Sequence, residues 1–331
     1  MHFANIMRLA GVAAFVAAEA LLFVPHASAQ PFPSRYVKVI IPNPAGGPLD
    51  VLTRAIGEGF RERTGQSLVV ESRPGGATTI GAAACKNSTP DGYTICLLTS
   101  GTITLNPFLY KSLPYDPEKD LEPITNLVTV RQVVMVGASV EAKTFQDLVA
   151  WSRKNPDKLA YGSIGPGSDA HLQIEWLAKK TGLKALHVPY QGATPALLAL
   201  DTGEVQMTLL TASELVLERI RSGKARALLV TSSKRDPNLP DVPTMQEAGL
   251  ESIGYQTWFG FFAPAGTPAD RIETLSKIIG DIVRSDSFRT KYLTGGFDAV
   301  GDTPAEFKKA LEARRKAGKA LIEISGVTIA Q

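Results

Sequence analysis

Short apolar runs alternate with amphipathic stretches of helical period along most of this chain. The first part of the pattern predicts strand, helix, strand, helix, strand, which is a βαβαβ unit with parallel strands. The strands of this unit are predicted at 37–41, 68–71 and 93–99, and its helices at 48–63 and 79–86.

A long apolar segment, 124–136, follows this unit and is interrupted by Arg131 and Gln132. We expect it to be a strand that crosses between two domains, and we expect 258–264 to be the return crossing. A second α/β unit lies between them, and two helices after Pro268 place the C-terminus back on the first domain. The elements predicted here are strands at 159–162, 185–189, 205–211 and 227–231, and helices at 145–154, 169–180, 195–200, 268 onward and 304–319, with one more ending at 221.

The predicted fold class is therefore α/β, with two α/β domains joined by two crossings. The first domain is discontinuous, 30–131 plus 256–331, and the second is 132–255. Ligands commonly bind in the cleft between such domains. The sequence shows no repeat of solenoid period, low-complexity tract or long linker, so it does not favour an array of modules.

The first 29 residues are typical of a secretory signal peptide. Arg8 precedes an apolar stretch, 9–24, and Ala27-Ser28-Ala29 forms a small-residue cleavage site before Gln30. The apolar stretch is short for a membrane span and contains Glu19. Because no cysteine stands at the cleavage site to take a lipid, we expect a soluble protein of a Gram-negative periplasm.

Composition narrows the class of partner. The chain has 331 residues, 44% of them hydrophobic, and a formal net charge of +3. The charge is small and evenly scattered, and no Lys/Arg run interleaves with aromatic residues, so we expect no nucleic-acid partner. The hydrophobic fraction is ample for globular cores.

Two cysteines, Cys85 and Cys96, flank a turn signal at 88–92. In an oxidising compartment this pair predicts a disulfide. Two buried free thiols are the alternative, because a helix end and the next strand need not approach within bridging range.

The first strand ends in a loop with Gly46 and Gly47 that enters a helix at Pro48. Glycines let the backbone approach a ligand, and the first N–H groups of a helix carry partial positive charge, so this loop suits a carboxylate or a phosphate. Turn chemistry alone can also require glycine here. Asp50 in the first helical turn would repel an anion directly, so we expect it to act through water, hold the loop or accept from an amine.

A second glycine-rich loop ends a strand of the second domain and contains Gly162, Ser163 and Ser168. Ser168 can cap the next helix, and the two serines can offer hydroxyl donors to a ligand. A plain N-cap is the alternative. Asp169 complements the helix dipole and is otherwise a stabilising charge.

Further candidate residues lie at the ends of other predicted strands. Strand carboxyl ends line the crevice of open parallel sheets, which adds Gly76 and Ser100 in the first domain. Arg73 is a minor candidate for a carboxylate contact, with a structural ion pair as the alternative. In the second domain Tyr190 and Gly192 belong to a third strand-to-helix loop, in which Tyr190 is expected to wall the cleft.

A series of segments then carries a family resemblance. They are PNPAGGPLDVLTR, VVESRPGGATTIGAAA, PDGYTI, NPFLYKSLPYDPEKDLEPI, YGSIGPGSDAHL, VPYQGATPALLAL, IRSGKARALLVTSSKRDPNLPDVPTMQEAGL and FFAPAGTP. On these segments the chain resembles the Bug family, the periplasmic solute-binding receptors of tripartite tricarboxylate transporters. The resemblance implies a type II periplasmic-binding-protein fold, a hinged receptor that closes on a small organic carboxylate, and delivery to the permease subunits of an inner-membrane transporter.

The resemblance also assigns residues by position. It places Ala45, Gly46, Gly47 and Asp50 at a ligand carboxylate, held largely through backbone and bridging water, and it matches Gly162, Ser163 and Ser168 to the second-domain loop. Relatives often carry Asp or Asn after the GEVQ segment, where this chain has Thr208, Leu209, Leu210 and Thr211. If these side chains face inward, they predict a less acidic, more apolar distal pocket around Thr211.

Two other functions remain as alternatives. An enzyme is disfavoured, because only His171 and His187 follow the signal segment and the sequence has no GxSxG, HExxH or phosphate-binding GK[ST] motif. We therefore expect no catalytic residue, no cofactor and no metal site. A receptor that presents its ligand to a sensor kinase fits the sequence as well as one that serves a permease. We expect the mature protein to be a monomer.

Overall fold

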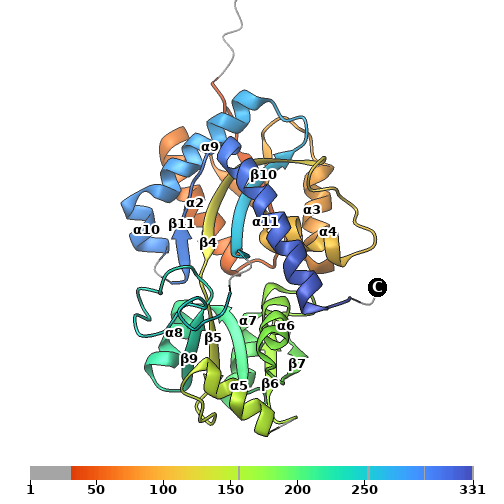
Figure 1. The fold of residues 1–331 in the computed structure, drawn as a ribbon. Coiled ribbons are helices and arrows are strands. Elements are labelled where there is room, and N and C mark those ends of the chain that lie inside the picture. Colours follow the sequence, from red (N-terminus) through yellow and green to blue (C-terminus); the bar gives the residue numbers. More distant parts are fainter. Residues whose placement is uncertain (1–30, 156, 252–253, 294, 330–331) are drawn as a thin grey trace, which may run out of the picture. The chain divides into compact units, whose positions relative to one another are not determined.

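The computed structural model describes residues 31–155, 157–251, 254–293 and 295–329 (Figure 1). The chain divides into two compact units, Met1–Ser34 and Arg35–Gln331, and the second unit is described below. The predicted signal peptide, 1–29, and its cleavage before Gln30 lie outside the described residues. Among the residues described, no helix has both the length and the apolar character needed to cross a membrane.

The first sheet has six strands in the order β11-β4-β10-β3-β1-β2. Strand β1 pairs in parallel with both β2 and β3, which confirms the predicted βαβαβ unit. Strand β10 returns antiparallel between β3 and β4. The strands are β1 (Val37–Ile41), β2 (Leu68–Ser72), β3 (Thr94–Thr99), β4 (Leu121–Val130), β10 (Thr257–Pro264) and β11 (Phe297–Ala299).

Six α-helices accompany this sheet and form with it what we call the first lobe. The apolar spacing and the Pro and Gly boundaries of the longer ones were readable in the sequence, whereas α4, α10, β11 and a π-helical turn at Gly101–Leu105 were not predicted. The helices are α2 (Pro48–Thr64), α3 (Thr79–Lys86), α4 (Asn106–Leu109), α9 (Ala269–Arg284), α10 (Asp286–Tyr292) and α11 (Pro304–Ser325).

The second sheet has five strands in the order β7-β6-β8-β5-β9, and with its helices it forms the second lobe. Strand β6 is parallel to β7 and β8, and β5 is antiparallel to β8 and β9. The strands are β5 (Gln132–Gly137), β6 (Ala160–Ser163), β7 (Leu186–Pro189), β8 (Met207–Thr211) and β9 (Ala225–Val230). The helices are α5 (Phe145–Lys154), α6 (Asp169–Thr181), α7 (Ala193–Thr202) and α8 (Glu214–Arg221).

Arg131 stands between the two sheets, because β4 ends at Val130 and β5 begins at Gln132. The predicted crossing segment therefore does contribute to both sheets, and the two residues that interrupt its apolar run lie where it passes from one to the other. Arg35–Gln331 forms one compact unit, so the division into domains 30–131 plus 256–331 and 132–255 stays a prediction.

Helix α11 contacts the first lobe, to which the sequence assigned it, and also the second lobe. Its residues Ala317 and Leu321 belong to the buried hydrophobic cluster of the second lobe. Gly318 lies against the first lobe so closely that a Cβ there would collide with the carbonyl oxygen of Thr104. Figure 1 shows α11 running from the first-lobe sheet toward α6. The C-terminal helix therefore braces the two lobes.

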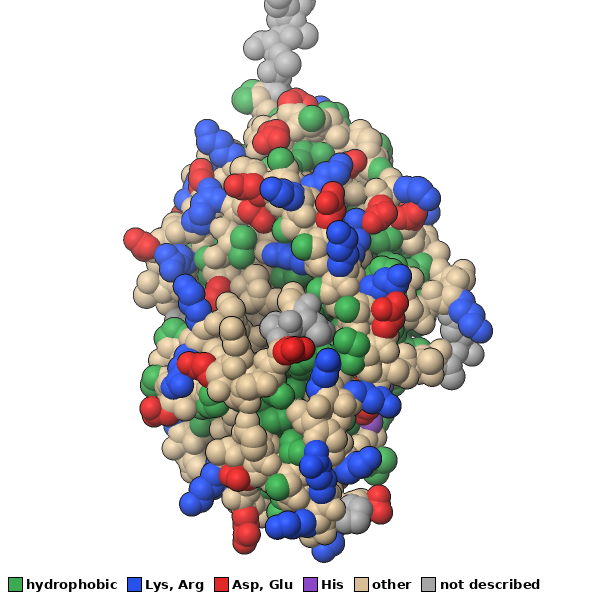
Figure 2. Space-filling view, viewed as in Figure 1, with side chains coloured by type: hydrophobic (Ala, Val, Ile, Leu, Met, Phe, Trp, Pro, Cys, Tyr) green, Lys and Arg blue, Asp and Glu red, His purple; other side chains and the backbone are tan. Residues whose placement is uncertain are grey.

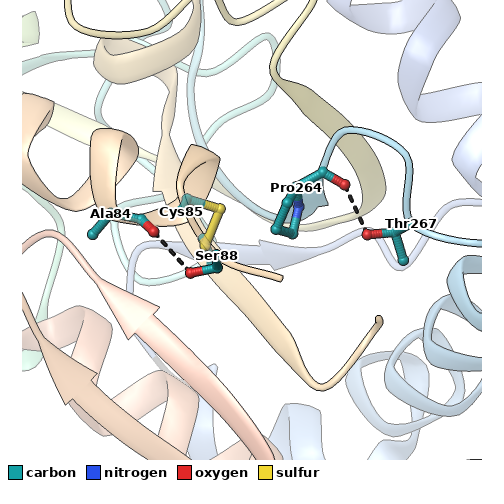
Figure 3. The surroundings of a disulfide bond; sticks show 6 residues. Ala84, Cys85, Ser88, Pro264 and Thr267 are labelled. Carbon is teal, nitrogen blue, oxygen red and sulfur yellow. Dashed lines mark hydrogen bonds between the residues drawn. A yellow bond between two sulfur atoms is a disulfide. The ribbon is translucent and has the colours of Figure 1, made fainter. Parts of the chain in front are cut away.

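Cys85 on α3 and Cys96 on β3 form a disulfide, which confirms the prediction and excludes the pair of free thiols (Figure 3). Their Cα atoms are 6.0 Å apart and both residues are fully buried. The bridge lies in a cluster that also contains Trp258 and Phe307, so it joins α3 to the sheet inside the core of the first lobe.

Basic and acidic side chains are interspersed on the face of the molecule shown in Figure 2. That face, which carries α11, shows no extended area of one sign. The arrangement on this face agrees with the small net charge of +3.

Candidate ligand-binding site

The predicted binding loops follow the carboxyl ends of strands in both sheets. In the first lobe they follow the parallel strands β1, β2 and β3, and in the second lobe the parallel strands β6, β7 and β8. Parallel strands present their carboxyl ends at one edge of a sheet, where the following helices begin. The sequence therefore placed its candidate residues on the edges of the sheets that bear helix N-termini.

Ser100 and Asp169 bring a loop of each lobe into contact. The Ser100 hydroxyl, after β3, donates to Oδ2 of Asp169 in the first turn of α6 at 3.2 Å. A Cβ at the neighbouring Gly101 would lie 4.0 Å from Oδ1 of Asp169. The loops after β3 and β6 thus meet directly, and the predicted Ser100 lies at that contact with its side chain fully buried.

Asp169 also binds the second crossing between the lobes. Thr257, the first residue of β10, donates to Oδ2 at 3.0 Å, and the hydroxyl of Tyr255 donates to Oδ1. Part of the Asp169 residue stays exposed, but these hydroxyls enclose its carboxyl group. Burial raises the pKa of Asp169 above its ordinary value, and the three hydroxyl donors oppose that shift. Sequence reasoning treated Asp169 as a helix-dipole charge and missed these contacts.

Asp50 holds the opening loop of the first lobe, which is one of the three roles left open for it. The Gly46 N–H donates to its Oδ2 at 2.9 Å, and Arg54 Nε donates to its Oδ1 at 2.9 Å. Hydrogen bonding to Arg54 is the largest cause lowering the pKa of Asp50. Gly46 has a φ of 81°, in the left-handed region that glycine adopts without strain. Ala45 and Gly46 are exposed, and Gly47 is half-buried.

The loop after β2 contains the predicted Gly76 and two residues that the sequence did not single out. Ala77 and Thr78 have φ values of 48° and 76°, which side chains disfavour at a cost of about 1–3 kcal/mol each. Asn106 Nδ2 donates to the carbonyl of Ala77 at 3.0 Å, and the hydroxyls of Thr78 and Thr102 are 2.7 Å apart. These bonds tie the exposed loop to the one after β3.

Arg73 forms an ion pair rather than a free anion contact. Its Nε donates to Glu71 Oε1 at 2.5 Å, and Lys38 pairs with the same carboxylate at 3.2 Å. The structural alternative for Arg73 is therefore the one observed. A ligand anion near the first-lobe loops would meet backbone N–H groups and hydroxyls.

Ser163 is fully buried at the end of β6, where its hydroxyl lies 2.6 Å from His187 Nε2. Ser168 accepts a hydrogen bond from the His171 N–H at 3.4 Å and is the N-cap of α6. Both serines thus bond within the second lobe. Gly162 lies beside the ring of Tyr190, because a Cβ there would be 3.2 Å from Cε2 of that ring.

Tyr190, Gly192 and Thr211 complete the predicted set in the second lobe. The Tyr190 hydroxyl donates to Glu204 at 2.9 Å, so its polar end is held within this lobe. Gly192 has a φ of 120° and is the N-cap of α7. Thr211 ends β8 opposite Gln132 and approaches Gly296, where a Cβ would lie 2.8 Å from its Cγ2.

The sequence predicted an apolar distal pocket on condition that the side chains of 208–211 face inward. Leu209 and Leu210 are buried in separate hydrophobic clusters of the second lobe. Thr208 is also fully buried and donates to the Gly162 carbonyl at 3.0 Å. A buried strand points successive side chains to opposite faces, so both leucines pack in hydrophobic clusters of the second lobe.

Several helices that start at these edges have no side-chain cap among the described residues. The N-cap residues of α2, α3, α7 and α8 are Gly47, Thr78, Gly192 and Ser213, and none accepts a capping hydrogen bond through its side chain. Helices α5 and α11, which start elsewhere, have complete capping boxes. Uncapped N-termini keep donors and positive dipole ends that suit an anion.

Two pockets lie apart from these loops. One of about 290 Å³ lies between α11 and the 117–123 segment of the first lobe, and one of about 260 Å³ lies beside α8 and β9. Neither is lined by a predicted ligand-binding residue. Within the described residues, no group of three or more His, Cys, Asp or Glu side chains is arranged to hold a metal ion.

Comparison with known proteins gives the class of this chain. Residues 52–327 match the model of the tripartite tricarboxylate transporter family receptor, TctC. BugT of Bordetella pertussis is 33% identical over 301 residues, covering 91% of this chain and 90% of BugT. The structure of R. palustris Rpa4515 with adipate has a TM-score of 0.82 and 30% identity over 90% of this chain and 99% of that one. MatC from Rhodopseudomonas palustris, with bound malate, has a TM-score of 0.78 and 27% identity over 88% of this chain and 100% of MatC.

The two sheets, their two crossings and these neighbours define a periplasmic solute-binding receptor of type II fold. The chain belongs to the TctC or Bug family of tripartite tricarboxylate transporter receptors.

Proposed function

We propose that this receptor captures a small organic carboxylate between the loops of its two lobes and delivers it to the permease of a tripartite tricarboxylate transporter. The observation that carries the proposal is the Ser100–Asp169 contact, because it brings the loop after β3 of one sheet to the loop after β6 of the other. A solute held by both sets of loops would link the lobes. A transporter could then bind the ligand-loaded conformation in preference to the empty one.

The chemistry of the loops favours an anion. Uncapped N-termini of α2 and α7 supply N–H donors, and Arg73 is already paired with Glu71. The ligand would therefore be held by backbone and hydroxyl groups rather than by a guanidinium fork. Adipate in the Rpa4515 structure and malate in MatC are bound by relatives, and dicarboxylates of this size are the first candidates for this chain.

Calorimetry and thermal shift with adipate, malate, an aromatic monocarboxylate and amino acids test the ligand class. We expect one carboxylate per monomer and a raised melting temperature. Uncharged analogues of each acid, such as the diamide of adipic acid, are the matched controls. Binding of neutral or cationic solutes alone would refute the anion site.

A variant pair tests the opening loop. Asp50→Ala removes the acceptor of the Gly46 N–H, so we expect at least tenfold weaker binding because the loop is no longer held. Arg54→Ala is the control. It removes the ion-pair partner of the Asp50 carboxylate, and because the Arg54 side chain is 61% exposed we expect little effect on binding. Equal affinity in wild type and Asp50→Ala would remove this loop from the site.

We infer that the protein acts without catalysis, cofactor or metal, in the periplasm and as a monomer. Ser163 and His187 lie at hydrogen-bond distance, but the serine is fully buried, so a substrate cannot reach it in this conformation. Steady consumption of a bound carboxylate by the purified protein would overturn this part. Mass spectrometry of the exported protein tests cleavage before Gln30, and light scattering tests the monomer.

Pull-down of membrane partners with and without ligand distinguishes a permease partner from a sensor-kinase partner. We expect the ligand-loaded receptor to retain permease subunits. If the receptor retained a sensor kinase and no permease subunit, its function would be signalling rather than transport.

A further inference from the structure

The loop at 163–168 of the second lobe rests on two stacked imidazole rings. His171 lies in the first turn of α6 and His187 on β7, with ring centroids 3.8 Å apart and planes within 11° of parallel. The centroid of the Tyr161 ring lies 5.0 Å from that of His187 and 6.4 Å from that of His171. The two histidines come from different elements, so their stacking is a tertiary contact beneath the loop.

Each imidazole makes a polar contact with the loop. The Gly167 N–H donates to His171 Nδ1 at 3.0 Å, and the Ser163 hydroxyl lies 2.6 Å from His187 Nε2. Ser163 in turn accepts the N–H of Gly165 at 3.1 Å. Gly165 and Gly167 both have positive φ and few conformational restrictions of their own. The Gly165 carbonyl also accepts from the Ser163 hydroxyl at 3.1 Å and from the Ser168 N–H at 3.2 Å. The histidines add the bond that holds the Gly167 N–H and the contact that places the Ser163 hydroxyl.

The bond to Gly167 fixes the protonation state of His171. A ring nitrogen that accepts an N–H bond carries no proton, so Nδ1 is the bare nitrogen of a neutral imidazole. Protonation there would turn an acceptor into a donor facing another donor. If both rings were charged, two positive groups would stand 3.8 Å apart in a half-buried site, which is strongly unfavourable.

Neighbouring charged groups do little to offset that cost. The charge of Glu175 on α6 acts on His187, and this carboxylate accepts a hydrogen bond from the Tyr161 hydroxyl at 2.7 Å. Asp169 is engaged by Ser100, Tyr255 and Thr257. Glu204 accepts a hydrogen bond from the Tyr190 hydroxyl, and the apolar side chains of Leu109 and Ile329 lie beside Gly167.

The direction of both pKa shifts agrees with this geometry. Burial is the largest cause lowering the pKa of His187 to about 4, with the charge of His171 next and Glu175 acting against them. Burial likewise lowers the pKa of His171. Both rings are therefore neutral at pH 7, and they gain protons only in acid.

We propose that His171 and His187 are positioning residues for the ligand-binding loop of the second lobe, and that their protonation releases this loop and weakens ligand binding. The proposal rests on the proposed function only for its second half. Neutral rings hold the N–H groups of Gly165 and Gly167 in place, and acid removes the acceptor on which Gly167 depends.

An NMR titration of the ligand-free mature protein tests the first half. Ring protons of the histidines and the amide signals of Gly165 and Gly167 are followed from about pH 7.5 downward. We expect the two amides to shift, and their hydrogen exchange to quicken, with the midpoint of ring protonation. Amides that stay unchanged while either ring titrates would overturn the proposal.

A variant pair separates positioning from general packing. The side-chain oxygen of His171→Asn can stand near the place of Nδ1 and accept from Gly167, whereas His171→Leu keeps bulk without an acceptor. Exchange of the Gly167 amide should rise at least tenfold in His171→Leu and should be restored in part by His171→Asn. Equal exchange in the two variants contradicts a role through hydrogen bonding. The wild-type titration needs neither variant to fold.

Calorimetry with adipate and with malate at about pH 7.5 and about pH 4.5, close to the lowered pKa of His187, tests the second half, with affinities compared per fully ionised ligand. We expect acid to weaken wild-type binding, and to weaken it less in His171→Asn/His187→Gln. An unchanged wild-type affinity, or equal pH dependence in the two proteins, overturns it. If neither acid binds at about pH 7.5, the failure belongs to the proposed ligand class, and the amide titration still decides the positioning role.

Discussion

Arg131 Nε donates to Asp236 Oδ2 at 2.7 Å, and Asp236 is fully buried. The same guanidinium pairs through Nη1 with Asp298 on β11. Because Arg131 stands between β4 and β5, one side chain joins the crossing, the first-lobe sheet edge and the 231–255 segment of the second lobe. Arg131 therefore links the crossing to both lobes through two ion pairs.

Replacing Arg131 should be strongly destabilising. Arg131→Met leaves the buried Asp236 carboxylate without its charge partner, and the expected loss is about 3–5 kcal/mol of unfolding free energy. Asp298→Ala is the control, because the side chain of Asp298 is 50% exposed and its ion pair should contribute at most about 1 kcal/mol. Urea unfolding measures both. A smaller loss in Arg131→Met than in Asp298→Ala contradicts the assignment.

The disulfide should contribute to stability by restricting the unfolded chain. Closing a loop of 11 residues is worth about 3 kcal/mol in the chain-entropy description. Cys85→Ala/Cys96→Ala should lower the unfolding free energy by about that amount, with a part added by the buried cavity. Wild type unfolded under reducing conditions is the matched control, since it loses the bridge and keeps both side-chain volumes. Equal midpoints with and without reductant would assign the loss to packing.

Local patterns explain what the sequence predicted well. The βαβαβ unit was predictable because apolar period, glycines and the Pro48 helix start agree over one contiguous stretch. The crossing at Arg131 was predictable because two polar residues break a buried apolar run. By contrast, β11 has only three residues and the Gly101–Leu105 turn is a single π-helical turn, and neither is long enough to show a period.

Contacts between residues far apart in the sequence could not be predicted at the site. Asp169 meets Ser100 across 69 positions and Thr257 across 88, and no local pattern announces such pairs. The same holds for the stacking of His171 on His187, which are 16 positions apart in sequence and come from α6 and β7. Loops were predictable as candidates, but which side chains turn toward the other lobe depended on tertiary packing.

Stability should fall as the pH is lowered from about 6.5 toward about 4. An unfolded histidine has a pKa of about 6.5, whereas that of His187 in the folded protein is lowered to about 4. In this window the unfolded chain binds more protons than the folded one, so stability rises with pH across it and is complete above it. The pKa of Asp50 is lowered from 3.8, so Asp50 stabilises the fold down to more acidic pH and does not produce this loss.

Urea midpoints at about pH 7 and about pH 5 measure this effect. His171→Asn/His187→Gln removes both titrating rings and keeps polar side chains of similar reach, so its loss of stability over the same interval should be smaller. Identical losses in the variant and the wild type would assign the pH dependence to groups other than these histidines.

The charge of Asp169 should be less important for stability than its ability to accept hydrogen bonds. Burial raises the pKa of this carboxyl, which means that the site disfavours the ion, while three hydroxyls from Ser100, Tyr255 and Thr257 need an acceptor. Asp169→Asn keeps an acceptor oxygen and removes the charge, so it should be clearly more stable than Asp169→Ala, which takes the acceptor away from Ser100 and Tyr255 at about 1–3 kcal/mol. The Thr257 hydroxyl can still donate to Gln132 Oε1, which lies 3.1 Å away. A double-mutant cycle of Asp169→Ala with Ser100→Ala isolates the contact between the lobes, and we expect a coupling of at least about 0.5 kcal/mol. If the two changes are additive in urea unfolding, the Ser100–Asp169 bond does not hold the lobes together, and Asp169 would act through its contacts with Tyr255 and Thr257 at the second crossing.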